Sequence, residues 1–284
     1  MSVANNLPRD KQLAVLGALV EGSSVRSTER MFGVHRDTII RLMVRVGQGC
    51  SSLLSEKMVD LPCNRLELDE LWAFVGKKQR HVTGMDPVSA GDTWTYVAID
   101  AETKLVPTFW TGKRDAVTTR DFIDDLASRL RHRVQITTDG LRLYVRPIAN
   151  AFGGGAGVDY AQLHKTYEAE PIGPGRYSPP KVTAIAKLPI FGEPVEELVS
   201  TSYVERQNLT IRMASRRFTR LTNAHSKKLE NHLAAVALHF AHYNLVRRHM
   251  TIRCTPAMAA GVESTMWSLG ELVDAALAAL PVES

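Results

Sequence analysis

Three acidic residues occupy positions from which a carboxylate could bind a metal ion: Asp69, Asp139 and Glu205. Asp69 lies in residues 64–75, where polar and apolar residues alternate, and Asp139 precedes Gly140 at the end of a β-branched run. Each acid has an ordinary alternative, because strand Asp residues face solvent, Asp-Gly pairs form turns and most helical Glu residues are solvated. Taken together, they predict a site for divalent cations.

Phosphoryl transfer is the chemistry that such a set of acids suits. Two Mg²⁺ or Mn²⁺ ions about 3.5–4 Å apart can activate an attacking hydroxyl and stabilise the leaving oxygen. These ions prefer carboxylate oxygens and keep several waters, so three acids suffice without His or Cys. Glu67, Glu70 and Asp100 lie near the same strands and are alternative ligands. Asp100 is the main rival, although its place before Ala101-Glu102-Thr103 suggests a hairpin turn.

The stretch that carries Glu205 is predicted to be helical, because neither Pro nor Gly occurs from Ser200 to Thr222. On a helix, Glu205, Asn208 and Arg212 are three and seven residues apart and share one face. A carboxylate, an amide and a guanidinium on one face suit a site that binds metal and contacts phosphate. The alternative is a solvated helix face.

The elements that must position these acids form a mixed sheet, and we expect an α+β fold with a catalytic domain over residues 64–284. Short turns separate the first three strands, which favours an antiparallel meander. Residues 149–200 are rich in Gly and Pro and are expected to be an insertion of loops with one weak strand. The expected strands are 64–75, 93–100, 105–110, 134–140 and 158–164, and the expected helices are 117–130, 200–222 and 229–246, with short surface helices after Thr255.

Residues 1–50 are expected to be a separate helical unit, joined to the rest by a linker over residues 51–63. Helices are predicted near residues 7–22, 24–32 and 36–46, with Gly47 and Gly49 ending the third. Two short helices joined by a turn containing glycine are typical of a helix-turn-helix, although a plain three-helix bundle has the same pattern. In a helix-turn-helix, the early residues of the second helix meet base edges. Here these are His35, Arg36, Asp37, Thr38 and Arg41.

Basic residues are concentrated in the last third of the chain. The 284 residues carry a net charge of +5, and Arg206 to Arg253 includes ten Lys or Arg and a single acid, Glu230. Such a local excess predicts contact with a nucleic-acid backbone. The residues that we expect to contact DNA there are Asn208, Arg212, Arg216, Arg217, Lys227, Lys228 and Arg247.

The cysteine pattern and the length of the apolar runs indicate the cellular compartment of the protein. The three cysteines fit neither a zinc pattern nor a disulfide framework, and free thiols in a reducing cytoplasm are expected. No signal peptide and no run of 18 apolar residues is present in this sequence, so we expect a cytoplasmic protein without membrane contact.

Five segments of the chain resemble the insertion-sequence-one family of bacterial DDE transposases, in the family's order. The likeness covers nearly the whole chain, including the helix-turn-helix. The segments are Leu68-Asp69-Glu70-Leu71-Trp72 with Val75-Gly76-Lys77-Lys78-Gln79, Thr137-Thr138-Asp139-Gly140, Ser202-Tyr203-Val204-Glu205-Arg206-Gln207-Asn208, Arg217 to Asn223, and His242-Tyr243-Asn244 with Arg247 and His249.

The resemblance implies an RNase H-like catalytic core in which Asp69, Asp139 and Glu205 bind Mg²⁺, with Mn²⁺ as a substitute. It also implies a nucleoid-associated bacterial enzyme whose N-terminal unit binds the terminal inverted repeats of a mobile element. Joining two DNA ends to target DNA in concert requires at least a dimer on DNA. Two alternatives are an RNase H-like nuclease that does not join, and a non-catalytic DNA-binding protein or domesticated remnant.

One feature departs from that family. Some members carry a Cys-rich zinc finger before the helix-turn-helix, but this chain begins close to that motif and its cysteines do not fit one. We therefore expect no zinc. The histidines His242 and His249 are interpreted as structural in preference to phosphate-binding.

Overall fold

The computed structural model of the chain describes residues 7–168, 181–219 and 222–280. Its centre is one six-stranded mixed sheet with the strand order β3-β2-β1-β4-β5-β6. The first three strands are antiparallel neighbours, β4 and β5 run parallel to β1, and β6 is antiparallel to β5. This mixed α+β architecture confirms the predicted fold class. The strands are β1 (Arg65–Val75), β2 (Gly91–Asp100), β3 (Phe109–Gly112), β4 (Val134–Thr138), β5 (Val158–Glu168) and β6 (Lys181–Phe191).

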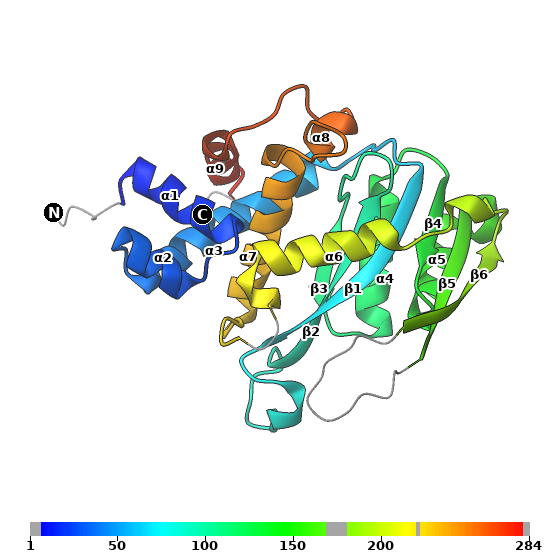
Figure 1. The fold of residues 1–284 in the computed structure, drawn as a ribbon, viewed down its shortest axis with the longest axis horizontal. Helices are drawn as coiled ribbons and strands as arrows, with labels where there is room; N and C mark the ends of the chain where they lie inside the picture. Colours follow the sequence, from blue (N-terminus) through cyan, green and yellow to red (C-terminus); the bar gives the residue numbers. More distant parts are fainter. Residues whose placement is uncertain (1–6, 169–180, 220–221, 281–284) are drawn as a thin grey trace.

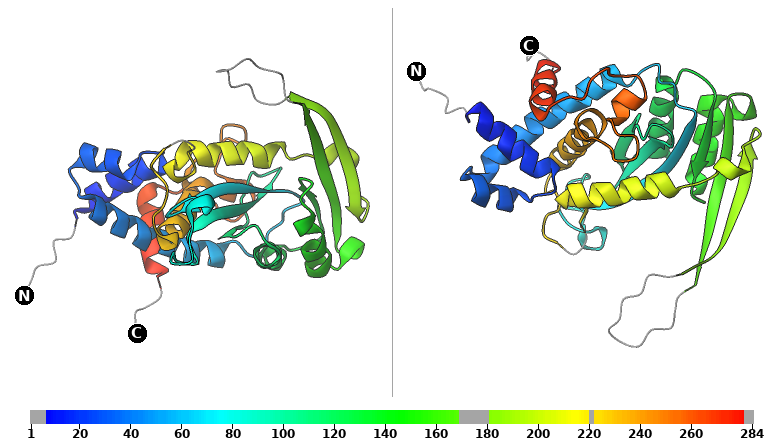
Figure 2. Two further views of the ribbon diagram at one scale, coloured as in Figure 1. Left: turned by 90° about the horizontal axis from the view of Figure 1, so that it is seen from below. Right: turned by 45° about the horizontal axis from the view of Figure 1, so that its top comes forward.

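Helices cover both faces of the sheet. In Figure 1, α6 (Ser202–Ala214) passes in front of β1 and β2, and α4 (Ala116–Arg129) lies behind them. Figure 2 shows the same layers from two other directions, with α5 (Val145–Phe152) on the side of α4 and the β5–β6 hairpin extending past the sheet. A helix on one face can therefore bring a side chain to the ends of the central strands.

The register of the two central strands places the two predicted Asp residues together. β1 and β4 are parallel, with Leu66 opposite Ile136 and Leu68 opposite Thr138. Thr138 is the last residue of β4, whereas β1 continues beside β2. Asp69 and Asp139 are thus the next residues on the two strands at the point where β4 leaves the sheet.

The N-terminal helices begin where the sequence predicts, but the third helix ends later. They are α1 (Arg9–Val20), α2 (Val25–Phe32) and α3 (Arg36–Lys57), and Gly33 makes the turn between the last two with a φ of 63°. The predicted end at Gly47 and Gly49 is wrong. A Cβ at Gly47 would collide with the carbonyl of Ala234, and one at Gly49 with that of Ala276. These glycines allow close helix packing and do not end the helix.

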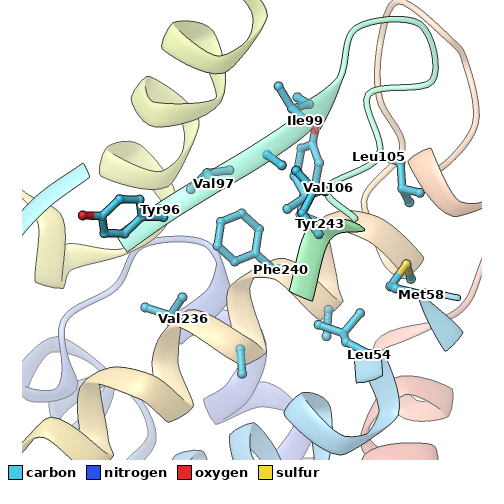
Figure 3. Close-up of a cluster of buried hydrophobic side chains, with 14 of the residues drawn as sticks. Leu54, Met58, Tyr96, Val97, Ile99, Leu105, Val106, Val236, Phe240 and Tyr243 are labelled. Atoms are coloured by element: carbon cyan, nitrogen blue, oxygen red, sulfur yellow. The ribbon is translucent and has the colours of Figure 1, made fainter. Parts of the chain in front are cut away.

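The partners of those glycines belong to the C-terminal helices, which are α7 (Leu229–Ala241), α8 (Pro256–Ala259) and α9 (Leu269–Ala278), with a π-helical turn over His242–Val246. Leu54 of α3 and Met58, which follows that helix, share a core with Phe240 of α7 and with Val97 and Ile99 of β2 (Figure 3). Helix α3 therefore packs with both the N-terminal helices and the sheet. The division of the chain at residues 50 and 63 stays a prediction.

Two further stretches differ from the prediction. The insertion near residues 149–200 contains the end of α5, a longer β5 and the unpredicted strand β6. Its Pro/Gly run at 171–180 lies outside the described residues. Strand β3 begins at Phe109, not at Leu105, because the Asn244 side chain bonds the backbone N–H and carbonyl of Val106. Leu105 and Val106 are buried in the core near Tyr243 (Figure 3). In the described part of the chain, no helix has both the length and the apolarity to cross a bilayer.

Candidate active site

Two predicted acids and one of their neighbours come together where β4 ends. One carboxylate oxygen each of Asp69, Glu70 and Asp139 lies within 4.8 Å of the others. The backbone N–H of Leu141 donates to Asp139 Oδ1 at 2.9 Å and holds the turn after β4. The chain is close-packed there, because a Cβ at Gly140 would lie 2.8 Å from the His164 ring. A larger residue at position 140 would therefore require the His164 side chain to shift.

Helix α6 is fixed above this group by a buried carboxylate. Glu67 Oε2 accepts hydrogen bonds from the backbone N–H groups of Tyr203 at 2.7 Å and Val204 at 3.1 Å, in the first turn of α6. A carboxylate at this position satisfies otherwise unpaired N–H groups and complements the helix dipole. Glu67 is therefore a cap supplied by β1, and the helix, not a metal ion, occupies its Oε2 atom.

The second anchor of α6 acts directly on the acidic group. Asn208 Nδ2 donates to Asp69 Oδ2 at 2.7 Å, and Asn208 is buried. Glu205, one turn earlier on the same helix, is near enough for its charge to raise the pKa of Asp69. The shared face of Glu205 and Asn208 is thus turned toward Asp69. Arg212, two turns after Glu205, is half-buried.

Burial and mutual repulsion disfavour the charged forms of these acids. Burial raises the pKa of Asp69 to about 6, and the charges of Asp139 and Glu205 add to the effect. Burial also raises the pKa of Glu70 to about 7, against the opposing influence of the Tyr144 hydroxyl and Arg114. Carboxylates that repel one another in a poorly solvated site favour a bound cation.

Unsatisfied oxygen atoms test whether this group fits a divalent ion. The Glu70 side chain is 1% exposed, and its Oε1 atom has no hydrogen-bond partner among the described residues. Asn208 Oδ1 is likewise buried without a partner there. Buried polar atoms normally find a partner. Oxygen donors of this kind, around two aspartates, match the preferences of Mg²⁺ and Mn²⁺.

Two basic side chains at the edge of the group were not predicted from the sequence. Arg114 donates to Glu70 Oε2 at 3.1 Å, and Lys165 Nζ forms an ion pair with Glu205 Oε1. Lys165 lies on β5, one residue beyond the predicted end of that strand. Continuing the β-strand alternation past His164 would have placed Lys165 on the sheet, but no sequence signal pairs it with Glu205.

Asp100, the main rival ligand, has a different role. Its Oδ2 atom accepts hydrogen bonds from the backbone N–H of Thr103 at 2.8 Å and from the Thr103 hydroxyl at 2.6 Å. This is the turn that follows β2, and Asp100 is opposite Leu66 on β1, three residues before Asp69. The geometry agrees with the hairpin-turn interpretation.

The predicted base-reading residues lie at the start of α3. His35, Arg36, Asp37 and Arg41 are exposed, and Thr38 is half-buried. His35 caps α3 by accepting a hydrogen bond from the Asp37 backbone at 3.3 Å, and Arg36 lies 3.4 Å from Glu29 in an ion pair. The side chains are therefore accessible, while contact with DNA stays a prediction.

A cavity of about 570 Å³ lies between the N-terminal helices and the segment that joins α6 to α7. Asp37 is the one acid among its described lining residues. Arg217 donates to Ser226 Oγ at 2.6 Å, forms no ion pair with a carboxylate among the described residues, and has its pKa lowered to about 10 by burial. The basic lining residues are Arg26, Arg36, Arg216, Arg217, Lys227 and Lys228. We call this cavity the basic cleft.

The residues around His242 mainly support the fold. The Asn244 side chain bonds the Val106 backbone through its oxygen at 3.1 Å and its nitrogen at 2.9 Å. The Tyr243 hydroxyl donates to the Lys104 carbonyl at 3.0 Å, and His242 is half-buried with its pKa lowered by burial. Arg247, which follows the π-helical turn, is exposed.

Comparison with known proteins yields only distant likenesses. No family model and no curated protein matches the chain. A Mos1 strand transfer complex matches with 16% identity and a TM-score of 0.24. The match covers 56% of this chain and 60% of the Mos1 chain. A piggyBac transposase synaptic complex with hairpin DNA matches with 13% identity and a TM-score of 0.41, over 98% of this chain and 73% of that one. Likenesses this weak assign no function, and we argue the function from the site itself.

Proposed function

We propose that this protein is a DNA transposase that cleaves the ends of a mobile element and joins them to target DNA. Asp69, Asp139 and Glu205 are its metal-binding acids. The observation that carries the proposal is the docking of α6: Glu67 caps the helix and Asn208 bonds Asp69. Glu205, one turn before Asn208, lies outside the group of Asp69, Glu70 and Asp139 but close enough for its charge to raise the pKa of Asp69. The sequence resemblance to the insertion-sequence-one family supports the same three residues.

The topology agrees with the RNase H-like core that the resemblance implies. An antiparallel meander, β1 to β3, is followed by two strands parallel to β1, and the strand order is β3-β2-β1-β4-β5. In this arrangement the two aspartates come from neighbouring strands and the glutamate from a helix on one face. A rigid sheet and an anchored helix can fix the three carboxylates with the precision that catalysis needs.

In the proposed mechanism, Asp69, Asp139 and Glu205 are the residues that would hold a divalent ion. Bound Mg²⁺ or Mn²⁺ would activate the attacking oxygen and stabilise the leaving oxygen. Asn208 holds the Asp69 carboxylate in one orientation, and Glu70 supplies a further oxygen from β1. No covalent enzyme–DNA intermediate is required, so we assign no Ser or Tyr nucleophile.

The proposed DNA contacts lie on two surfaces. His35, Arg36, Thr38 and Arg41 on α3 would meet base edges of the terminal inverted repeats. The basic cleft would contact phosphates, because Arg216, Lys227 and Lys228 are exposed at its walls and Arg217 has no acidic partner among the described residues. Arg212 and Arg247 would extend these contacts. We further propose a homo-oligomer on DNA in the bacterial cytoplasm, since two ends must be joined in concert.

The test is a Glu205→Gln variant, assayed on a labelled duplex that carries the element's terminal repeat. We expect cleavage to fall at least about 10³-fold, because the loss of one ligating charge costs several kcal/mol in the transition state. Binding measured by gel shift should stay near wild type. Glu230→Gln, at the one acid in the basic stretch, is the matched control and should cleave normally. Cleavage by Glu205→Gln at the wild-type rate would remove Glu205 from the site.

A further inference from the structure

The acidic group and its neighbours include more acidic than basic side chains. The four carboxylates near the end of β4 are accompanied by two basic side chains, each paired with one of the outer acids. With all groups ionised, two negative charges remain, which is the charge that one divalent ion neutralises. The acids are Asp69, Glu70, Asp139 and Glu205, and the bases are Arg114 and Lys165.

The two basic residues are held differently. Arg114 packs over the Trp94 ring, with its guanidinium carbon 4.7 Å from the ring centroid, while it bonds Glu70. A stacked, planar guanidinium is a fixed partner. Lys165 instead extends a flexible side chain from β5, and its ammonium reaches Glu205, whose side chain is 49% exposed. A lysine of this kind can exchange one anion for another by rotating its side chain.

One oxygen of Glu205 is occupied by these contacts. Its Oε1 atom binds the Lys165 ammonium and also accepts a hydrogen bond from the Thr201 hydroxyl at 2.8 Å. A carboxylate oxygen with two donors has little capacity left for a metal ion, and the ammonium charge repels a second cation. The group formed by Asp69, Glu70 and Asp139 is not blocked by Lys165 in this way.

We propose that Lys165 controls access to Glu205. In the DNA-free protein its ammonium neutralises Glu205 and disfavours a second divalent ion there, so that the chain binds one ion. When DNA is bound, a phosphate near the site offers Lys165 another anion, and Glu205 is released. This inference rests on the proposed function, and it makes Lys165 a positioning residue that couples DNA binding to completion of the site.

Titration of the DNA-free protein with Mn²⁺ by isothermal calorimetry tests the first half of the proposal. We expect one ion per chain for the wild type, and a second ion for Lys165→Met with at least tenfold higher affinity than any second site of the wild type. Lys165→Arg, which keeps the charge, should behave as the wild type. Lys187→Met is the matched control, because Lys187 lies on the neighbouring strand and donates to the Glu196 carbonyl at 2.6 Å.

The outcomes separate this inference from the proposed function. Identical stoichiometry and affinity in the wild type and Lys165→Met would overturn the role of Lys165, as would two ions in the DNA-free wild type, and both leave the metal site intact. Absence of any ion in every variant would overturn the metal site and, with it, the inference. Circular dichroism of each variant checks that the fold is retained.

The second half concerns the phosphate. In a Glu205→Gln background, Lys165 loses its carboxylate partner and cleavage is blocked, so Lys165 is available to DNA throughout a binding experiment. Adding Lys165→Met to this background should lower the slope of log affinity against log salt by about one. An unchanged slope would contradict the transfer of Lys165 to phosphate.

Discussion

The acidic group at the end of β4 and the basic cleft beside α3 have opposite charge imbalances. At the acidic group, four carboxylates accompany two basic side chains, and burial raises the pKa values of Asp69 and Glu70. In the basic cleft, one acid accompanies six Lys or Arg residues among the described lining residues, and burial lowers the pKa of Arg217. The first region is short of cations and the second is short of anions.

The two regions also differ in rigidity. The carboxylates lie on central strands or on an anchored helix, and hydrogen bonds from Asn208 and Leu141 orient two of them. Most basic side chains of the cleft are exposed at the ends of helices and in the segment after α6. Fixed geometry serves chemistry, whereas mobile charges serve affinity. Changes in the first region should therefore alter reaction rates, and changes in the second should alter binding.

The largest expected effect is at Asp69. Asp69→Asn removes a ligating charge, and we expect DNA cleavage to fall about 10³-fold or more. Asp100→Asn is the matched comparison, because the amide oxygen can still accept from Thr103, and it should cleave at nearly the wild-type rate. Rates on one labelled duplex measure both. Equal losses in the two variants would restore Asp100 as a ligand.

A smaller loss is expected at Asn208, which orients Asp69 without contacting the reacting atoms. Asn208→Ala should lower activity by about 10–100-fold, the range typical of residues that orient metal ligands. It should also weaken Mn²⁺ binding in a titration without DNA. Leu209→Ala, at the adjacent position that is 44% exposed, is the control for helix stability. Unaltered metal affinity in Asn208→Ala would show that Asp69 needs no such support.

In the basic cleft, the combined Lys227→Gln and Lys228→Gln variant should affect binding only. We expect the salt slope of DNA affinity to fall by up to about two, since each lost phosphate contact contributes about one. The cleavage rate at saturating DNA should be unchanged. Arg131→Gln, which removes an exposed charge paired with Asp60, should keep the wild-type slope. A lower rate at saturation would mean that the cleft also positions the reacting strand.

The smallest effect concerns pH in the absence of metal. The pKa of Glu70 is raised from 4.5 to about 7, so its contribution to stability is complete below pH 4.5 and is lost as pH rises through 7. In EDTA, the melting temperature of the wild type minus that of Glu70→Gln should be roughly 3 °C larger at pH 5 than at pH 8. The buried histidines His232 and His239 also make stability depend on pH, because burial lowers their pKa values. Both proteins share this contribution, so it cancels in the difference. Saturating Mg²⁺ should abolish the difference, and a pH-independent difference in EDTA would contradict it.

Local patterns predicted much of the sheet. Strands β1, β2 and β4 and helices α4 and α7 follow from residue periodicity, which also placed Asp69 inside β1 and Asp139 at the end of β4. The roles of Gly47 and Gly49 were not predictable, because they depend on the approach of Ala234 and Ala276 from far along the chain. Local glycine propensity alone suggests a helix end.

Strand β6 and the supporting contacts of the site were missed for related reasons. Most of β6 is exposed on both faces, including Val182, Ile185 and Leu188, so it lacks the alternation that marks a half-buried strand. The cap from Glu67 to α6 and the pair of Lys165 with Glu205 exist only after distant segments have docked. Sequence could nominate the acids and place Asn208 beside Glu205, but it could not predict the contacts that Glu67 and Lys165 make with α6.

The measurement that tests the central claim most directly is cleavage and joining of a labelled duplex carrying the element's terminal repeat. It is run with Mg²⁺, with EDTA, and with Asp139→Ala in Mg²⁺, alongside a gel-shift measurement of binding. We predict joined product only for the wild type in Mg²⁺, with binding retained by the variant. Tight binding without chemistry under Mg²⁺ or Mn²⁺ would contradict the catalytic site and favour a DNA-binding remnant.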